Sequence, residues 1–248
     1  MKRSIKVAIA LLSFARLANA QTPDKALSSF DKVIVSPLVS LILVAGEQES
    51  IKLQYENIEP DKVNYIVQNK TLHIYLDDAK ITVKNQKWRD GDQTYQKPIY
   101  EKDVKVTAYV TYKQLKSLDV RGEEETTCRD ELASDVFKLR VYGQAKVTVA
   151  SLKARKLKAA FYGENKVTIL SGQAVKQRYR VYGDNEIDTE NLIGQNVSAH
   201  SYGESQLRVN ASNRMGVMAL GESDIRYAGG AHLRKGLVLG DVTIRRAE

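Results

Sequence analysis

Hydrophobic and polar residues alternate along the C-terminal half of the chain, and this alternation starts again about every twenty residues. The stretch RVYGQAKVTV at 140–149 returns as AFYGENKVTI at 160–169 and as RVYGDNEIDT at 180–189. On both sides of each glycine, apolar residues fill every second position and polar ones fill the positions between. This period of two is typical of strands with one buried face. Each unit therefore predicts a strand, a glycine turn and a second strand, followed by a less regular return.

Seven glycines mark the repeat, with spacings of 21, 20, 20, 20, 18 and 19 residues. They are Gly122, Gly143, Gly163, Gly183, Gly203, Gly221 and Gly240. The residues four places after them are mostly apolar: Thr126, Val147, Val167, Ile187, Leu207, Ile225 and Ile244. Glycine suits a corner because it adopts positive φ at little steric cost. The repeat thus predicts glycine corners around a continuous apolar core.

A repeat of this length without helical periodicity is typical of a solenoid. We predict an all-β fold, a single-stranded parallel β-helix with rungs of about 20 residues, regular over 119–246. An antiparallel meander is the alternative, but it needs a second turn signal as regular as the glycine. Residues 30–118 form an irregular β half, with strands expected at 32–35, 39–44, 50–55, 62–67, 71–76 and 104–112. No linker separates the halves, so residues 30–248 are expected to be one domain.

A polar stretch, KNQKWRDGDQTYQKPIYEKD at 84–103, interrupts this pattern and contains the only tryptophan, Trp88. We interpret it as a loop, and a loop of this length is either functional or mobile.

Residues 1–20 have a basic start, a short apolar run and the small residues Ala18 and Ala20, which together predict a signal peptide cut between Ala20 and Gln21. Residues 21–29 would begin the mature chain, with no transmembrane segment and a formal charge of +4 instead of +8. The expected location is the periplasm or the cell surface.

Cys128 has no partner for a disulfide, so we expect it to be buried in the core.

The phrase before each glycine supplies the candidate binding residues. Alternation places one tyrosine per rung on the outer face, with a second outward column two residues earlier. The candidate ligand-binding residues are Arg140, Tyr142, Tyr162, Arg180, Tyr182, His200 and Tyr202. Rings beside guanidinium groups suit glycans, because the C–H face of a sugar packs on an aromatic ring. The alternative is a tyrosine ladder that only stabilises the sheet.

Charge is uneven along the repeat: residues 138–180 contain eleven basic residues and one acidic residue, Glu164. Pairing between rungs, with Glu125 over Lys146 and Asp135 over Lys156, explains part of this excess. The remainder is either a solvated, salt-bridged face or a surface that attracts a polyanion, such as an acidic polysaccharide, lipopolysaccharide or extracellular DNA. The sequence indicates no cofactor, no metal site and no specific nucleic-acid binding, although a column of acidic residues after the glycines leaves calcium open. It also leaves the oligomeric state open.

No motif of a nucleophile with its base, of a zinc protease or of a phosphate-binding loop occurs in the sequence. One enzymatic alternative remains, because polysaccharide lyases and glycoside hydrolases also use β-helices and place carboxylates on one face. Asp184, Arg180 and Glu204 are the residues that could supply such a set.

The entry FDKV at 30–33, the run VKVTAYVTYKQLKSLDVRG at 104–122 and the glycine phrases that follow resemble the head GIN domain family of exported bacterial proteins, labelled auto-transporter adhesins. The resemblance covers roughly residues 30–246 and implies a right-handed β-helix. This sequence has YGEN, YGDN, YGES and LGES where the family has turns resembling Ser-Gly-Ala-Ser. We expect an exported, non-catalytic binding or envelope-structural module for a carbohydrate or other anionic envelope polymer.

Overall fold

The computed structural model describes residues 20–21, 23–101 and 103–247. The predicted signal peptide at residues 1–20 lies outside the described residues, except for Ala20. Strand β1 (Ala20–Gln21) contains the predicted cleavage point and pairs antiparallel with β5 (Ser50–Glu56). Cleavage there remains a prediction.

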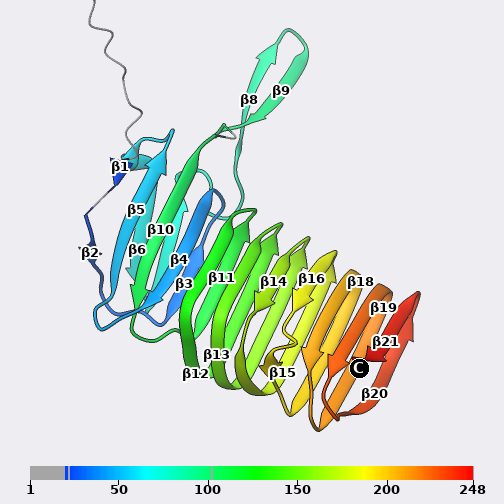
Figure 1. Cartoon of the computed structure of the whole chain (residues 1–248). Coiled ribbons are helices and arrows are strands. Elements are labelled where there is room, and N and C mark those ends of the chain that lie inside the picture. The colour runs from blue at the N-terminus through cyan, green and yellow to red at the C-terminus, as the bar shows by residue number, and fades with distance from the viewer. Residues whose placement is uncertain (1–19, 22, 102, 248) are drawn as a thin grey trace, which may run out of the picture.

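The C-terminal part is a β-solenoid of about six turns, which confirms the predicted fold class. Figure 1 shows its rungs stacked from green to red. The strands are β11 (Ser117–Gly122), β12 (Glu125–Gly143), β13 (Lys146–Gly163), β14 (Lys166–Ile169), β15 (Gly172–Gly183), β16 (Asn185–Asp188), β17 (Leu192–Ile193), β18 (Asn196–Asn210), β19 (Arg214–Ala228), β20 (His232–Leu239) and β21 (Val242–Arg246). They pair in parallel, and successive glycine corners lie over one another in register.

The predicted core columns are buried. The two columns that flank the glycine corner in the central rungs are at most 1 % exposed: Val141, Phe161, Val181, Val147, Val167, Ile187 and Leu207. Cys128 is also buried and pairs with Val149 in the next rung, as expected. Burial raises the pKa of its thiol to about 12, so the thiol is protonated and unreactive in the folded protein.

The return between glycine phrases is also a strand, which the sequence pattern did not predict. Strands β12 and β13 run through it without a break and wrap around the core. The alternation fails there because inward residues lie three apart at the bend, as at Ala154 and Leu157. A register shift between Cys128 and Glu131 disturbs it further.

The N-terminal part contains all six predicted strands, each within one residue of the expected bounds. The observed strands are β3 (Lys32–Val35), β4 (Val39–Ala45), β5, β6 (Val63–Gln68), β7 (Thr71–Leu76) and β10 (Lys105–Tyr112). Parallel pairs β3–β11 and β4–β12 connect this part to the solenoid, whereas β5–β10 and β6–β7 are antiparallel. A 3₁₀ turn (Pro60–Lys62) precedes β6, and β2 (Lys25–Ala26) pairs with β5. That residues 30–248 form one domain remains a prediction.

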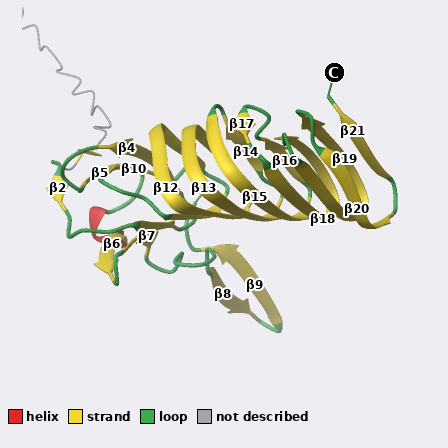
Figure 2. Cartoon of the chain, turned by 90° about the horizontal axis from the view of Figure 1, so that it is seen from below, coloured by secondary structure: helices red, strands yellow, loops and turns green. Residues whose placement is uncertain are grey.

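The polar stretch expected to be a loop is a hairpin of β8 (Asn85–Asp90) and β9 (Gln93–Pro98). Gly91 has φ 58° at the first position of its two-residue turn, as a type II′ hairpin requires. Trp88 and Tyr95 stack across the strands with ring centroids 5.5 Å apart. The hairpin projects away from the body in both views (Figures 1 and 2). All its side chains are exposed. Strands without a buried face do not need alternating apolar and polar residues, so the sequence lacks the period-two pattern that predicts a strand.

The last rung differs from the others at two inward positions. Lys235 lies in register with buried Val217, and Arg246 lies in register with buried Tyr227. A register shift between Val217 and Ala219 interrupts the pairing of β19 with β20. Charges at inward positions and irregular pairing are devices that discourage further strands from adding to an exposed edge.

Replacement of Gly163 by alanine tests the corner geometry. Gly163 has φ 112°, and a Cβ there would lie 2.2 Å from the carbonyl oxygen of Gly143. We expect Gly163→Ala to lower the free energy of unfolding by at least about 2 kcal/mol, or roughly 4–8 °C in Tm. Gly216→Ala is the matched control, because its nearest neighbour would be 3.9 Å away. Equal melting temperatures for the two variants in calorimetry would contradict the steric argument.

Candidate functional site

The strand segments that lead into the glycine corners form one outer face, which we call the tyrosine face. It consists of the outward side chains of residues 136–142, 156–162, 176–182, 196–202 and 214–220. Because the strands are parallel and in register, equivalent side chains form straight columns along the solenoid. All seven candidate ligand-binding residues lie on this face, so the structure places them together.

The column next to the glycines is a stack of four tyrosine rings, which we call the tyrosine ladder: Tyr142, Tyr162, Tyr182 and Tyr202. Neighbouring ring centroids are 4.9, 4.9 and 5.0 Å apart, and the rings are parallel to within 7°. This spacing matches the separation of paired strands, so the backbone register sets the stack.

The stacking limits how the ladder can contact a ligand. Both faces of the Tyr162 and Tyr182 rings are covered by neighbouring rings, so these residues offer only ring edges and hydroxyl groups to solvent. Tyr202 ends the ladder beside Leu220, and its hydroxyl contacts the sulfur of Met218 at 3.6 Å. Tyr142 ends it beside Arg121. Sugar stacking on each ring, as the sequence suggested, is therefore not available in the middle of the ladder.

The second candidate column contains Arg140, Ala160, Arg180 and His200 in register. Arg140 forms a two-pronged ion pair with the buried carboxylate of Asp119, with Nη2 and Nε at 2.8 and 2.9 Å from its oxygens. This hydrogen bonding raises the pKa of Arg140. Burial, followed by the charges of Arg178 and Arg180, lowers the pKa of His200.

The small side chain of Ala160 leaves a hollow of about 240 Å³ in the tyrosine face. Ala159 and Ala160 form its floor, and its remaining lining residues are all basic: Lys138, Arg140, Lys158, Arg178 and Arg180. Of these five, only Arg140 has an acidic partner among the described residues. The hollow is therefore surrounded by positive charge from the rung of Ala160 and from the rungs on either side of it.

Positive charge continues beside the hollow in Lys156, Lys176 and Arg214, which line a second depression of about 590 Å³. The charge of Lys158, followed by burial and the charges of Arg178 and Lys176, lowers the pKa of Lys156. No ion pair within the described residues neutralises Lys156, Lys158 or Lys176. The lowered pKa is the expected response to neighbouring like charges.

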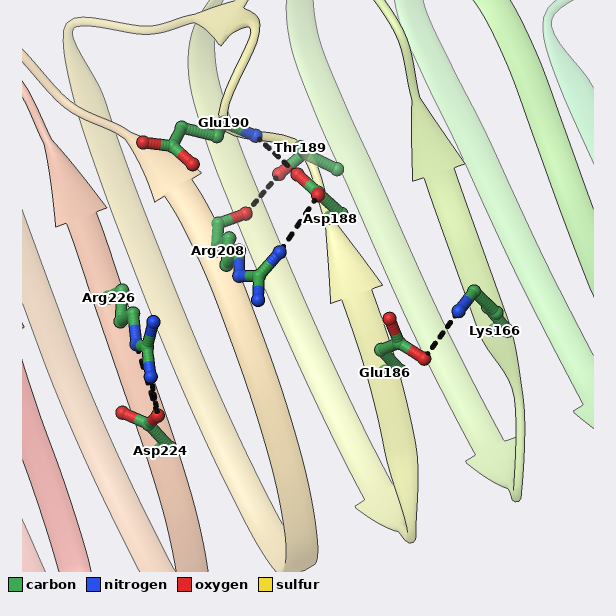
Figure 3. Close-up of polar contacts among 8 residues, drawn as sticks. All are labelled: Lys166, Glu186, Asp188, Thr189, Glu190, Arg208, Asp224 and Arg226. Carbon is green, nitrogen blue, oxygen red and sulfur yellow. Dashed lines mark hydrogen bonds and ion pairs between the residues drawn. The ribbon is translucent and has the colours of Figure 1, made fainter. Parts of the chain in front are cut away.

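The face that follows the glycine corners has a different charge arrangement. Figure 3 shows its ion pairs, which join Lys166 to Glu186 at 2.7 Å, Arg208 to Asp188 at 3.5 Å and Arg226 to Asp224 at 2.9 Å. The predicted pair of Lys146 with Glu125 is confirmed at 2.8 Å. Each of these basic residues has an acidic partner, whereas Lys138, Lys158, Arg178 and Arg180 on the tyrosine face have none among the described residues.

The predicted pair of Asp135 with Lys156 is wrong. Asp135 binds Arg155 at 2.7 Å, and Lys156 lies in register with Val136. The register shift after Cys128 moves the partner by one residue. The glycine spacings of 21 and 20 indicate one extra residue in this rung but not its position, so counting forward from Gly122 and Gly143 gave Lys156. Lys156 consequently joins the unpaired group.

A buried amide ladder lies just inside the glycine corners, and the sequence analysis missed it. Asn165 Nδ2 donates to Asn185 Oδ1 at 3.0 Å, and the same oxygen accepts the backbone N–H of Asn165 at 3.2 Å. The Asn165 Oδ1 in turn accepts the N–H of Ala145. Both asparagines also donate to the carbonyl of the tyrosine three residues earlier, which fixes the turn that carries the tyrosine ladder.

Asp184 and Glu204, the carboxylates of the enzymatic alternative, are exposed at successive glycine corners. Neither lines the hollow over Ala160. Among the described residues, no group of three or more His, Cys, Asp or Glu side chains is arranged to hold a metal ion.

Ser36 and His73 form a close pair in the N-terminal part, with Oγ 2.9 Å from Nε2. The Ser36 hydroxyl is buried and donates to the Lys80 carbonyl at 2.7 Å, so its oxygen accepts a hydrogen bond from the Nε2–H of His73. Burial, followed by the charges of Lys80 and Arg121, lowers the pKa of His73 to about 4. This pair is consistent with a structural hydrogen bond.

The fold and its faces define a β-solenoid that displays side chains in straight columns. A family model described as "Putative auto-transporter adhesin, head GIN domain" matches residues 29–231. The chain belongs to this family, as its resemblance predicted. The family description points to an exported or surface protein. Within the described residues, no helix is long and apolar enough to cross a membrane.

Solved structures share this fold at low sequence identity. A "putative adhesin" from Bacteroides fragilis is 20% identical, with a TM-score of 0.73 over 93% of this chain and 99% of its own. One from Parabacteroides distasonis is 17% identical, with a TM-score of 0.67 over 93% and 98%. A "putative lipid binding protein" from the same species is 13% identical, with a TM-score of 0.63 over 92% and 96%. Comparison with curated proteins found no match.

The depressed pKa of His73 predicts a loss of stability in acid. Between its folded value of about 4 and its ordinary value of 6.5, the unfolded chain binds a proton that the folded protein does not. The contribution of neutral His73 to the free energy of unfolding is therefore fully present above its ordinary pKa of 6.5, and it falls as the pH drops from about 7 to about 5. Urea unfolding of the wild type and of His73→Gln at both pH values measures it. The same decrease in both proteins would contradict the assignment to His73.

Proposed function

We propose that the protein is an exported, non-catalytic, adhesin-like module whose tyrosine face binds an anionic polysaccharide of the cell envelope. The periplasm and the cell surface are both compatible with this role. Membership of the adhesin family supports the general class. The ligand chemistry is inferred from this chain's own side chains.

The hollow over Ala160 is the observation that carries the proposal. Four of its basic residues, Lys138, Lys158, Arg178 and Arg180, have no acidic partner among the described residues. Structural pairing accounts for the charges on the neighbouring face but not for these. A carboxylate or sulfate group that enters the hollow would relieve the repulsion among them and gain charge-assisted hydrogen bonds.

The tyrosine ladder gives the same face a second kind of contact. Its hydroxyl groups line up at the spacing of the rungs, and no hydrogen bond within the described residues uses the hydroxyls of Tyr142, Tyr162 or Tyr182. A polysaccharide that lies along the solenoid axis would place its hydroxyls against this row and its acidic groups against the basic columns. Such a repeated, weak set of contacts suits an extended polymer.

Removal of one unpaired charge tests the electrostatic part. We expect Lys158→Gln to weaken binding of polygalacturonate about three- to fivefold, because one exposed charge contact contributes up to about 1 kcal/mol. Lys153→Gln removes an exposed charge on the return segment and serves as the matched control. Calorimetric titration at two salt concentrations measures both variants, with dextran as the uncharged polymer. Equal weakening by both variants would show non-specific attraction and overturn the assignment to this face.

Filling the hollow tests its shape without changing any charge. Ala160 points outward, so we expect Ala160→Leu to keep the melting temperature nearly unchanged and to reduce polygalacturonate binding at least as much as Lys158→Gln. Unchanged binding by Ala160→Leu would show that the hollow does not receive the acidic groups.

The ladder hydroxyls can be removed while the stack is kept. Tyr162→Phe and Tyr182→Phe retain the ring contacts at 4.9 Å, so we expect wild-type melting temperatures together with weaker polymer binding. Unaltered binding in both variants would leave the ladder a purely structural element.

Release of reducing ends from polygalacturonate, abolished by Asp184→Asn, would instead establish the enzymatic alternative.

A further inference from the structure

A second site lies at the end of the tyrosine ladder, where the solenoid meets the base of the β8–β9 hairpin. The cleft there has a volume of about 780 Å³, within the usual range for small-molecule sites. Its walls come from three places in the sequence: the turn before β4, the two connections of the hairpin and the first glycine corners. Figure 1 shows the hairpin connections beside the first rungs of the solenoid.

Most of the cleft surface is apolar. Its apolar walls are formed by Pro37, Leu38, Ile81, Val83, Pro98 and Tyr100. Ile81 is 68% exposed, more than Ile66, Ile99 and Ile193, the other exposed isoleucines among the described residues. The hydroxyl of Tyr100 donates to the Asp77 carbonyl at 2.7 Å and thereby fixes the position of its ring in the wall.

The ring of Tyr142 borders the cleft with an uncovered face. One face stacks on Tyr162, and no other ring or cation–π contact within the described residues reaches the opposite one. Arg121 occupies the next place in the column, but its guanidinium group is directed to the Lys80 carbonyl at 3.4 Å. The ladder therefore has no aromatic or cationic partner on this side of Tyr142, and a flat ring in the cleft would supply one.

The charge at the cleft is opposite to that of the tyrosine face. Three carboxylates, Glu101, Glu123 and Glu124, line it together with one guanidinium group, that of Arg121. Glu101 pairs with Lys97 at 3.5 Å. Within the described residues, neither Glu123 nor Glu124 forms an ion pair, although Glu124 Oε2 accepts the backbone N–H of Glu123 at 3.0 Å. An anionic ligand would meet this net negative charge in apolar surroundings, whereas a cationic one would neutralise it.

We infer that this cleft binds a small aromatic amine, whose ring stacks on the free face of Tyr142 and whose ammonium group lies against Glu123 and Glu124. The apolar walls cover the remainder of the ring. This site differs from the proposed polysaccharide face both in its ligand class and in the sign of its charge.

Tryptamine and indole-3-acetate are suitable probes, because they share an indole ring and differ in the sign of the side-chain charge. In calorimetric titration of the full chain, we expect tryptamine to bind at one site and indole-3-acetate at least about tenfold more weakly. We expect Tyr142→Ala to weaken tryptamine binding about tenfold, since an aromatic pair contributes up to about 1.5 kcal/mol.

Tyr202→Ala is the matched control, because Tyr202 ends the same ladder with one stacked neighbour and lies outside the cleft. It should bind tryptamine as the wild type does. A second pair of variants, Glu123→Gln and Glu124→Gln, should reduce the preference for tryptamine over indole-3-acetate.

Equal affinity for the two probes, or equal effects of Tyr142→Ala and Tyr202→Ala, would overturn the inference. Binding of neither probe at millimolar concentration would overturn it as well. Tyr142 belongs to both proposed sites, so the charge variants distinguish them: Glu123→Gln should leave polygalacturonate binding unchanged, and Lys158→Gln should leave tryptamine binding unchanged, because the cleft lacks Lys158, Arg178 and Arg180.

Discussion

The in-register stacking of parallel strands is the constraint on which the remainder of this structure depends. Each residue lies over its equivalent in the preceding rung, about 4.8 Å away, so every position becomes a column of similar environments. Gly143, Gly163 and Gly183 show how narrow that environment can be, because a Cβ on any of them would approach the carbonyl of the previous glycine to within 2.4 Å. In the column beside them, Asn165 donates its side-chain amide to Asn185 Oδ1. This geometry repeats each contact along a column, so a favourable side-chain contact recurs at every rung, and a repulsive contact does so too.

The two outer faces respond to that constraint in different ways. On the face after the glycine corners, basic residues have acidic partners in a neighbouring position, as Lys146 has Glu125 and Lys166 has Glu186. On the tyrosine face, the stacking of rings is favourable, whereas the clustering of Lys158, Arg178 and Arg180 is not. Like charges in adjacent rungs destabilise a sheet. On the other face such neighbours, Lys146 over Lys166 and Arg208 over Arg226, each have an acidic partner. Lys158, Arg178 and Arg180 have none among the described residues, which is consistent with a role in binding rather than in folding.

Local periodicity explains what the sequence could predict. The period placed the core columns and the four ladder tyrosines, because each follows from its distance to the nearest glycine. The amide ladder was available to the same reasoning, since Asn165 and Asn185 lie two places after a glycine, in phase with the core. Features that depend on a local irregularity were not accessible: the shift after Cys128 paired Asp135 with Arg155, and the bend near Ala154 hid the third strand of the rung.

Tertiary placement sets the remaining limits. The β8–β9 hairpin has no buried face and so gave no alternating pattern, although its Gly91-Asp92 turn is a recognisable hairpin signal. Arg121, the neighbour of Tyr142 in the column, directs its guanidinium group to the carbonyl of Lys80, a residue distant in sequence. The hollow over Ala160 requires knowledge of which side chains surround a small one. Column membership was therefore predictable, whereas the shape of the surface between columns was not.

The charged inward positions of the last rung bear on how such a protein can change its length during evolution. With Lys235 and Arg246 in place of core residues, the final rung is a poor template for a further one, so growth at this end is disfavoured. An internal rung has equivalent neighbours on both sides and contacts only those, so a duplicated rung would find a matching environment. Gain or loss of rungs is then confined to the interior of the repeat. Each added copy would lengthen the tyrosine face by one row and leave both ends of the molecule as they are.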